Sequence, residues 1–81
     1  MKYTLEERES CLILTIEGSI SDDYLREVRN AFDHAISGEK DLIVDLSEVT
    51  FISSSGLGLL FNSNTRLKTK GLRIVLSGAT D

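Results

Sequence analysis

Apolar and polar positions alternate at the start of this chain. Tyr3 and Leu5 alternate with Thr4 and Glu6, a pattern that predicts an edge strand over 3–8. The segment CLILTIE at 11–17 is apolar enough for a more central strand, with a hairpin at Ser10 between the two. The run DLIVDL at 41–46 is typical of a strand covered on both faces, as in a parallel sheet, and LRIVL at 72–76 predicts a last strand.

Two segments instead show helical spacing. Ser21 followed by Asp22 and Asp23 suits the positive end of a helix, so we expect a helix over 22–37, with Gly38 as its left-handed stop. Its expected buried face is Leu25, Val28, Phe32, Ala35 and Ile36. A second helix is expected from Ser55 to just before Gly71. Its expected face is Leu57, Leu60, Phe61, Asn64 and Leu67.

The predicted order is strand, strand, helix, strand, helix, strand. This order predicts one α/β domain over 1–81 with a mixed, mainly parallel sheet and two right-handed crossovers. Since GATD ends the chain directly after a strand, no third helix covers the sheet surface that this strand exposes. We therefore expect a homodimer through the uncovered sheet face, or another partner there.

Composition excludes several classes of function. The 81 residues carry 13 acidic and 9 basic side chains, a net charge of −4, without the clustered Lys and Arg of nucleic-acid binders. No segment reaches the roughly 18 apolar residues of a membrane helix, and the N-terminus does not resemble a signal peptide, so we expect no membrane insertion and a cytoplasmic location. Protein or small-molecule partners remain.

The chain has one cysteine and one histidine, and we expect neither to form a reactive or metal-binding site. The only cysteine, Cys11, lies in an apolar run and is expected to be a small buried hydrophobe. His34 has no second His or Cys near it, so we expect a half-exposed helix residue and neither a metal site nor a cofactor.

Ser53, Ser54 and Ser55 lie where a strand leads into a helix. Open α/β sheets place their ligand or partner sites there, and the unpaired N–H groups of the first helical turn attract anions. Helix capping explains one or two serines, and Gly56 can allow close packing on the sheet. The spacing of a phosphate-binding loop is missing, and so is a base for a nucleophilic serine, so we expect no enzyme. Modification of a hydroxyl by another protein is the remaining chemical interpretation.

Residues around the serines could take part in binding a partner. Phe51 and Leu57 could form an apolar rim, although burial in the core is the expected role of each. Asp22, Asp23 and Tyr24 are expected at the same edge of the sheet and could touch the partner, or they could be solvated first-turn residues. Asp45, expected near the end of its strand, could hold the serine loop by accepting backbone hydrogen bonds.

The segment DLIVDLSEVTFISSSGLGLLF, with IEGSI upstream, resembles the STAS domain family, whose best-known members are bacterial anti-sigma factor antagonists. The likeness covers essentially the whole chain. It implies a binding switch, in which the unphosphorylated domain binds an anti-sigma factor that is also a serine kinase and so frees sigma. Phosphorylation of a serine before Ser/Thr-Gly-Leu ends the binding. On this chain that serine is Ser54, with Ser55 as its neighbour and helix cap.

The chain departs from the family pattern at three points. Ser53 replaces the aspartate that commonly precedes the target serine, and Ser21 replaces an aspartate often found after Gly-x-Ile. Family members also usually continue with a further helix, which is missing here. Loss of the aspartate at 53 motivates an alternative, a constitutive STAS accessory subunit of a transporter or other assembly that is not phosphorylated.

Overall fold

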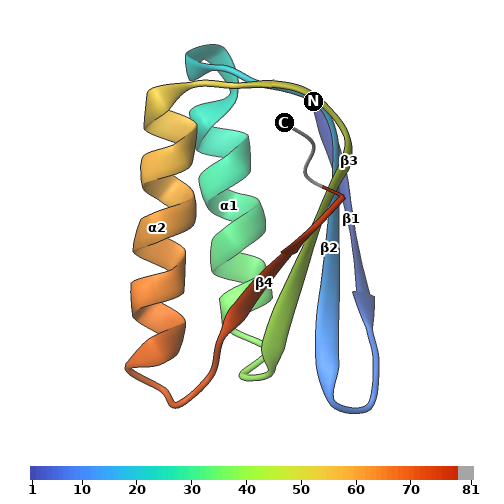
Figure 1. Ribbon diagram of the computed structural model, residues 1–81, viewed down its shortest axis with the longest axis vertical. Coiled ribbons are helices and arrows are strands. Elements are labelled where there is room, and N and C mark those ends of the chain that lie inside the picture. The colour runs from blue at the N-terminus through green and yellow to red at the C-terminus, as the bar shows by residue number, and fades with distance from the viewer. Residues whose placement is uncertain (79–81) are drawn as a thin grey trace.

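A computed structural model describes residues 1–78 as one sheet and two helices (Figure 1). The elements in chain order are β1 (Lys2–Glu7), β2 (Cys11–Ile20), the 3-10 helix η1 (Asp22–Tyr24), α1 (Leu25–Ile36), β3 (Asp41–Ile52), α2 (Ser54–Lys68) and β4 (Ile74–Ser77). This order confirms the predicted α/β class. The expectation that no third helix follows the last strand concerns residues 79–81, which lie outside the described residues.

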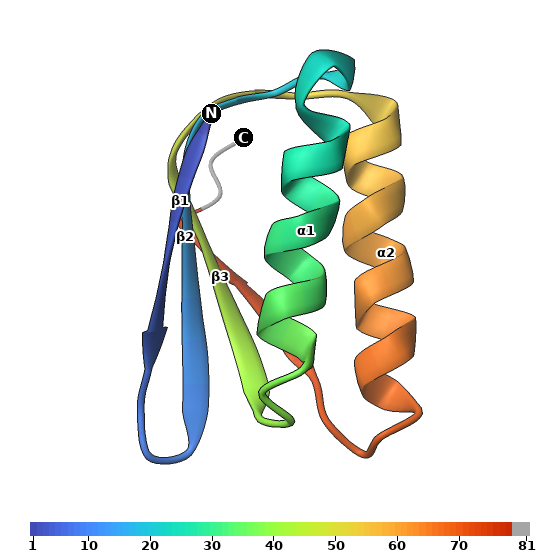
Figure 2. The same cartoon turned by 180° about the vertical axis from the view of Figure 1, so that it is seen from behind.

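The sheet has the strand order β1-β2-β3-β4, with β1 antiparallel to β2 and the other neighbours parallel. Both crossovers step across the sheet in the same direction, and right-handed crossovers then place both helices on one face. Figures 1 and 2 show α1 and α2 together on that face. The expectation that 41–46 is covered on both faces is therefore wrong.

Alternate residues of the central strands build the core against the helices. Leu12, Leu14 and Ile16 of β2 are buried beside Leu42 and Val44 of β3. Residues between them face the open side of the sheet, which is why Cys11, predicted to be buried, is only half-buried. Helix α1 completes the core, and only Leu25 of its predicted face is not buried; the buried residues are Val28, Ala31, Phe32, Ala35 and Ile36.

The ends of α1 differ from the prediction. Residues 22–24 form the 3-10 turn η1, and Ser21 makes no side-chain capping bond; its carbonyl oxygen accepts the N–H of Tyr24 at 2.9 Å. At the other end Glu39, and not Gly38, has the left-handed backbone, with φ of 57°. A Cβ at Gly38 would collide with Leu12 Cδ1. Gly38 is thus suited to close packing on β2 rather than to a left-handed stop.

The strands that lead to the serines are longer than predicted. β2 and β3 stay paired up to Ile20 and Ile52, with register shifts between Thr15 and Glu17 and between Gly18 and Ser19. Gly18, with φ of 97°, adopts the left-handed backbone that such a shift needs. The predicted end of the third strand at 46 is therefore wrong, and Asp45 lies inside β3 instead of near its end.

Helix α2 turns a different face to the sheet than its apolar spacing predicts. Its buried residues are Gly56, Leu60, Ser63 and Leu67, whereas Leu57 and Phe61 are exposed. The small residues Gly56 and Ser63 face inward, so two large apolar side chains are left outside the core. The predicted stop is confirmed, because Gly71 has φ of 77° just after basic residues in the last turn.

Candidate functional site

The serine row begins one residue before α2, and Ser53 is its N-cap. The Ser53 Oγ accepts the backbone N–H of Gly56 at 3.1 Å, and the Ser53 carbonyl accepts that of Leu57 at 3.0 Å. The Ser53 N–H donates to the carbonyl of Ile20 at 2.9 Å, which ties the start of α2 to the end of β2. The prediction that Ser55 caps the helix is therefore wrong, because the helix begins at Ser54.

The capping bond of Ser53 is expected to stabilise the protein. We expect Ser53→Ala to lower the free energy of unfolding by about 1 kcal/mol, because the N–H of Gly56 loses its acceptor. Ser53→Asp should retain the cap, and Ser55→Ala, at an exposed position, should change stability by less than about 0.5 kcal/mol. Urea denaturation of the three variants checks this. Equal losses for Ser53→Ala and Ser55→Ala would show that the cap contributes nothing.

Ser54 and Ser55 occupy the first turn of α2, and both are exposed. Their backbone N–H groups belong to the four at a helix N-terminus that have no partner inside the helix. The helix dipole adds a partial positive charge at this point, and the first turn contains no acidic residue that would offset it. The Ser54 hydroxyl therefore lies in water at a position that favours an anion.

Gly56 fixes how closely this turn approaches the sheet. A Cβ at residue 56 would lie 2.8 Å from Ile20 Cγ2 and 3.3 Å from Ile52 Cγ1. The ends of β2 and β3 thus contact the helix backbone directly. This packing, together with the Ser53 bonds, holds the Ser54 turn against a rigid layer.

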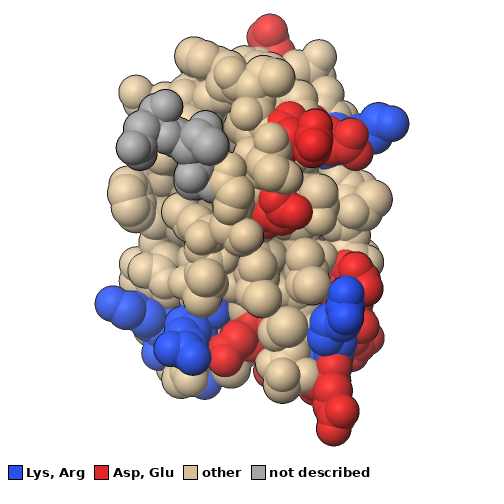
Figure 3. Space-filling model, turned by 45° about the vertical axis from the view of Figure 1, so that its right-hand side comes forward, with Lys and Arg blue, Asp and Glu red and all other residues tan. Residues whose placement is uncertain are grey.

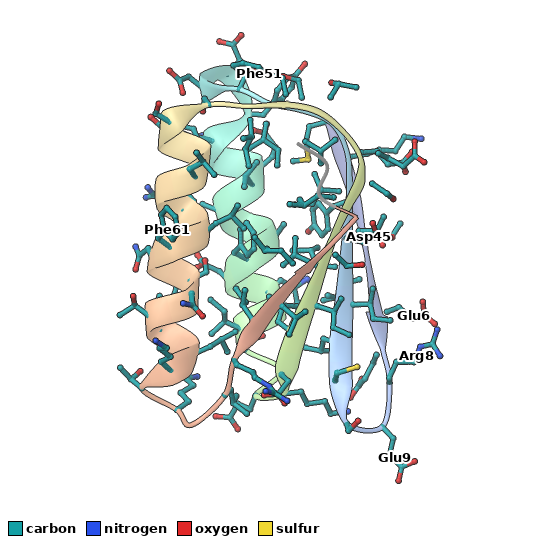
Figure 4. All side chains as sticks on the ribbon, in the orientation of Figure 1. Glu6, Arg8, Glu9, Asp45, Phe51 and Phe61 are labelled. Carbon is teal, nitrogen blue, oxygen red and sulfur yellow. The ribbon has the colours of Figure 1, made fainter. Side chains whose placement is uncertain are left out.

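An apolar rim lies beside the serines. Phe51 is 56% exposed and Leu57 is 41% exposed, so the expectation that both are core residues is wrong. Phe51 projects from the end of β3 at the upper pole of the molecule (Figure 4). The cause is the length of β3, which carries Phe51 beyond the layer that the helices cover.

Acidic side chains lie at the same pole. Asp22, Asp23 and Tyr24 form η1, directly after the end of β2 that bonds to Ser53, and all three are exposed. Figure 1 shows this turn next to the beginning of α2. The structure thus brings the predicted partner-binding residues together, while their contact with a partner stays a prediction.

Asp45 does not hold the serine loop. Its Oδ1 accepts the backbone N–H of Ser47 at 2.9 Å within β3, and this bond lowers the pKa of the carboxyl below its ordinary value. Gly78, just after β4, packs against this pair, because a Cβ there would lie 2.8 Å from the Ser47 nitrogen and 3.0 Å from Asp45 Oδ1. The predicted Asx-like bond exists, but it lies within β3, where Asp45 pairs with Ser77 of β4, and not at the serine loop.

This bond gives Asp45 a pH-dependent contribution to stability. A carboxyl whose pKa is lowered on folding stabilises the protein above its unfolded pKa, and the contribution disappears as pH falls through the folded pKa. We expect the wild type to exceed Asp45→Asn in urea midpoint at about pH 7, and the difference to shrink as pH falls below about 4, the ordinary pKa of an aspartate carboxyl. Asp23→Asn at an exposed position is the control. A constant difference across this range would contradict the assignment.

Sequence reasoning missed a polar groove between the two helices. Arg29, Asn62, Ser63 and Arg66 line it, and Arg66 Nη1 lies 2.7 Å from Asp33 Oδ1. Ser63 is the one sequence signal for this groove. It is a serine at a buried position of α2, where a large apolar residue would be expected. His34 is an exposed residue of α1. Within residues 1–78 no three potential metal ligands come together, and no helix has the length and apolarity to cross a bilayer.

Residues 2–81 match the family model of the STAS domain, so the chain belongs to the STAS domain family. Solved structures of anti-sigma factor antagonists share its fold. SpoIIAA in its unphosphorylated form is 19% identical with a TM-score of 0.81, and 99% of this chain aligns with 76% of that one. A Mycobacterium paratuberculosis anti-sigma factor antagonist is 23% identical, with a TM-score of 0.80 over 93% of this chain and 66% of its own.

A third structure shows the Bacillus cell fate determinant SpoIIAA in the phosphorylated form. It is 20% identical, with a TM-score of 0.78 over 98% of this chain and 74% of its own. A sequence comparison with curated proteins finds no match. At these identities the likeness to the solved structures establishes the fold and not the activity.

Proposed function

We propose that this protein is an anti-sigma factor antagonist whose binding is switched off by phosphorylation of Ser54. The observation that carries the proposal is a difference between two serines. The Ser53 hydroxyl is engaged in the capping bond with the Gly56 N–H, whereas the Ser54 hydroxyl is exposed and makes no capping bond. In the unphosphorylated form, the surface formed by the serine row, the apolar rim and η1 would bind an anti-sigma factor with serine kinase activity. This binding would release sigma.

The chemistry of the modification suits this position. The Ser54 oxygen attacks the γ-phosphorus of ATP, the bond to the bridging oxygen breaks and ADP leaves, while the kinase accepts the hydroxyl proton. The product adds about −1.5 to −2 charges and three acceptor oxygens. The free N–H groups of the first turn tolerate that charge. A partner surface closed over Phe51 and Leu57 would have to desolvate it, which is unfavourable without a matching cation.

The two substitutions among the departures from the family pattern, at Ser53 and Ser21, have different consequences. Ser53 makes the capping bond that an aspartate would also make, so the serine preserves the local geometry and removes only a charge. Ser21 lies next to Asp22 and Asp23, so this part of the pole remains acidic. A kinase with a basic docking surface would still meet two carboxylates beside Ser54.

A competition experiment tests the proposed function. Adding the unphosphorylated protein to a complex of the cognate anti-sigma factor with its sigma factor should release sigma in proportion to the amount added. A variant with the apolar rim removed, Leu57→Asp, should release less than a tenth as much, while Lys68→Ser at the far end of α2 should act like the wild type. Failure of the wild type to release sigma would contradict the proposal, and stable binding to a transporter instead would support the constitutive subunit.

A further inference from the structure

The polar groove between the helices lies on a part of the surface that the proposed switch does not use. It has a volume of about 320 Å³, and all of its lining residues belong to α1 and α2, which lie side by side (Figures 1 and 2). Gly78, the last described residue, lies against Ser47 of β3 and so belongs to the sheet layer. Clefts that hold small molecules begin at about 300 Å³, so the groove is large enough for one.

Ser63 brings to the groove a hydroxyl that the fold does not use. The residue is 3% exposed and lines the groove. Thr65 and Thr69 donate their hydroxyls to backbone carbonyls of the preceding turn at 3.1 and 2.7 Å, whereas the Ser63 hydroxyl has no hydrogen bond to another residue within 1–78. No fully buried side-chain oxygen or nitrogen of these residues lacks a partner, so the Ser63 oxygen opens into the groove. A hydroxyl at so buried a position is unfavourable unless something in the groove bonds to it.

The charges of the groove leave one guanidinium without a counterion. Asp33 Oδ1 lies 2.7 Å from Arg66 Nη1, and this ion pair joins the two helices. Arg29, one turn before Asp33 on α1, has no ion-pair partner among residues 1–78. On the face drawn in Figure 3, by contrast, most basic side chains lie next to acidic ones. Two arginines and one aspartate give the groove a net charge of +1, in a chain whose net charge is −4.

These groups match a small molecule with one carboxylate. A guanidinium donates two parallel hydrogen bonds to a carboxylate, and a single negative charge balances Arg29. A phosphate group, with about −1.5 to −2 charges, would exceed that balance beside the Asp33 carboxylate. Five of the seven lining residues are polar or charged, so the body of the ligand should be polar as well. We propose that the groove binds a small hydroxy acid, with its carboxylate on Arg29 and a hydroxyl bonded to Ser63 and to the Asn62 amide.

NMR titration of the ¹⁵N-labelled protein with gluconate tests the site. Gluconate carries one carboxylate on a polyhydroxy chain, sorbitol is the same chain without the carboxylate, and inorganic phosphate is the alternative anion. We expect gluconate to shift the amide signals of the groove residues with a Kd of about 1 mM or below, and sorbitol to shift none. Phosphate should bind about 10-fold more weakly or less. The absence of gluconate shifts at about 20 mM, or binding of sorbitol or phosphate as tight as that of gluconate, would overturn the proposal.

Two arginine variants locate the carboxylate. Arg29→Gln should weaken gluconate binding about 10-fold or more, because the carboxylate loses its guanidinium. Arg26→Gln is the matched control, since Arg26 is an exposed residue of α1 that does not line the groove. It removes the same charge from the same helix and should bind gluconate within about 2-fold of the wild type. Equal weakening in both variants would mean that gluconate responds only to net charge, and the site would then be wrong.

Ser63→Ala separates binding from folding. Removal of a hydroxyl that has no partner in the protein should leave the urea midpoint unchanged or raise it, while gluconate binding weakens about 3-fold or more. A lower midpoint with unchanged gluconate binding would assign the Ser63 hydroxyl to the fold and contradict its role toward the ligand.

This site goes beyond the proposed switch and can fail independently of it. None of the residues that line the groove belongs to the serine row, the apolar rim or η1. Phosphorylation of Ser54 in a protein that does not bind gluconate would therefore contradict the groove site alone. Gluconate binding by a protein whose Ser54 is not modified would contradict the switch alone.

Discussion

Ser54→Asp is expected to weaken binding to the anti-sigma factor by about 30-fold or more, which corresponds to about 2 kcal/mol. The reason is the position of Ser54 in the first turn of α2, beside an apolar rim. A carboxylate there is stable in the free protein, because unpaired N–H groups and the helix dipole favour it. In the complex it would be desolvated beside Phe51 and Leu57 without an opposite charge from this chain. Isothermal titration calorimetry measures the difference.

Two variants separate the effect of charge at Ser54 from other causes. Ser54→Ala removes the hydroxyl without adding charge, so it should bind within about 3-fold of the wild type. Thr69→Asp introduces the same charge at the other end of α2, and it should leave the affinity unchanged. Unchanged affinity in Ser54→Asp, or equal losses in Ser54→Asp and Ser54→Ala, would contradict the switch.

Phe32→Ala should produce the largest loss of stability, about 3–5 kcal/mol. The Phe32 side chain is 1% exposed and belongs to the core cluster between α1 and the sheet, with Leu14 and Leu42. The total stability expected for 81 residues is about 4–12 kcal/mol, so a large fraction of the variant should be unfolded if the wild type lies at the lower end. Urea denaturation followed by circular dichroism measures the loss.

Phe51→Ala is the matched control for this substitution, because it removes the same side chain from an exposed position. It should lower the free energy of unfolding by less than about 1 kcal/mol. Similar losses at both positions would mean that Phe51 is as deeply packed as Phe32, and the assignment of Phe51 to the exposed rim would then be wrong.

The element order and the main core could be predicted from the sequence because period and burial agree there. Val28, Phe32, Ala35 and Ile36 of α1 are spaced for one face, and this face is buried. The strand at 41–46 was recognisable from its apolar run, and it forms the first half of β3. In both segments each local preference supports the same tertiary arrangement.

The prediction was wrong where tertiary packing selects between faces that look alike in sequence. Leu57 and Phe61 have the spacing of a core face, but Gly56 must contact Ile20, and this contact rotates α2 so that both face outward. The upper part of β3 carries Ser47, Glu48 and Thr50, so it reads as a loop, and its pairing with β2 keeps it extended. Such non-local pairing cannot be inferred from composition.

The helix N-terminus at the serine row was predicted correctly, but the capping role was assigned to the wrong serine. A strand end followed by serines and glycine predicts a helix N-terminus, and the structure has one there. Which serine caps depends on where the helix begins, and boundaries are the least certain part of a sequence-based prediction. The capping bond from Gly56 to Ser53 decides it and leaves Ser54 in water.

Mapping phosphate after incubation with ATP and the cognate anti-sigma factor kinase tests the central claim most directly. We predict a single phosphate on Ser54 by tandem mass spectrometry, none on Ser53 or Ser55, and loss of the complex in step with modification. Phosphate on another residue, no phosphate at all, or a complex that persists when Ser54 is fully modified would contradict the account.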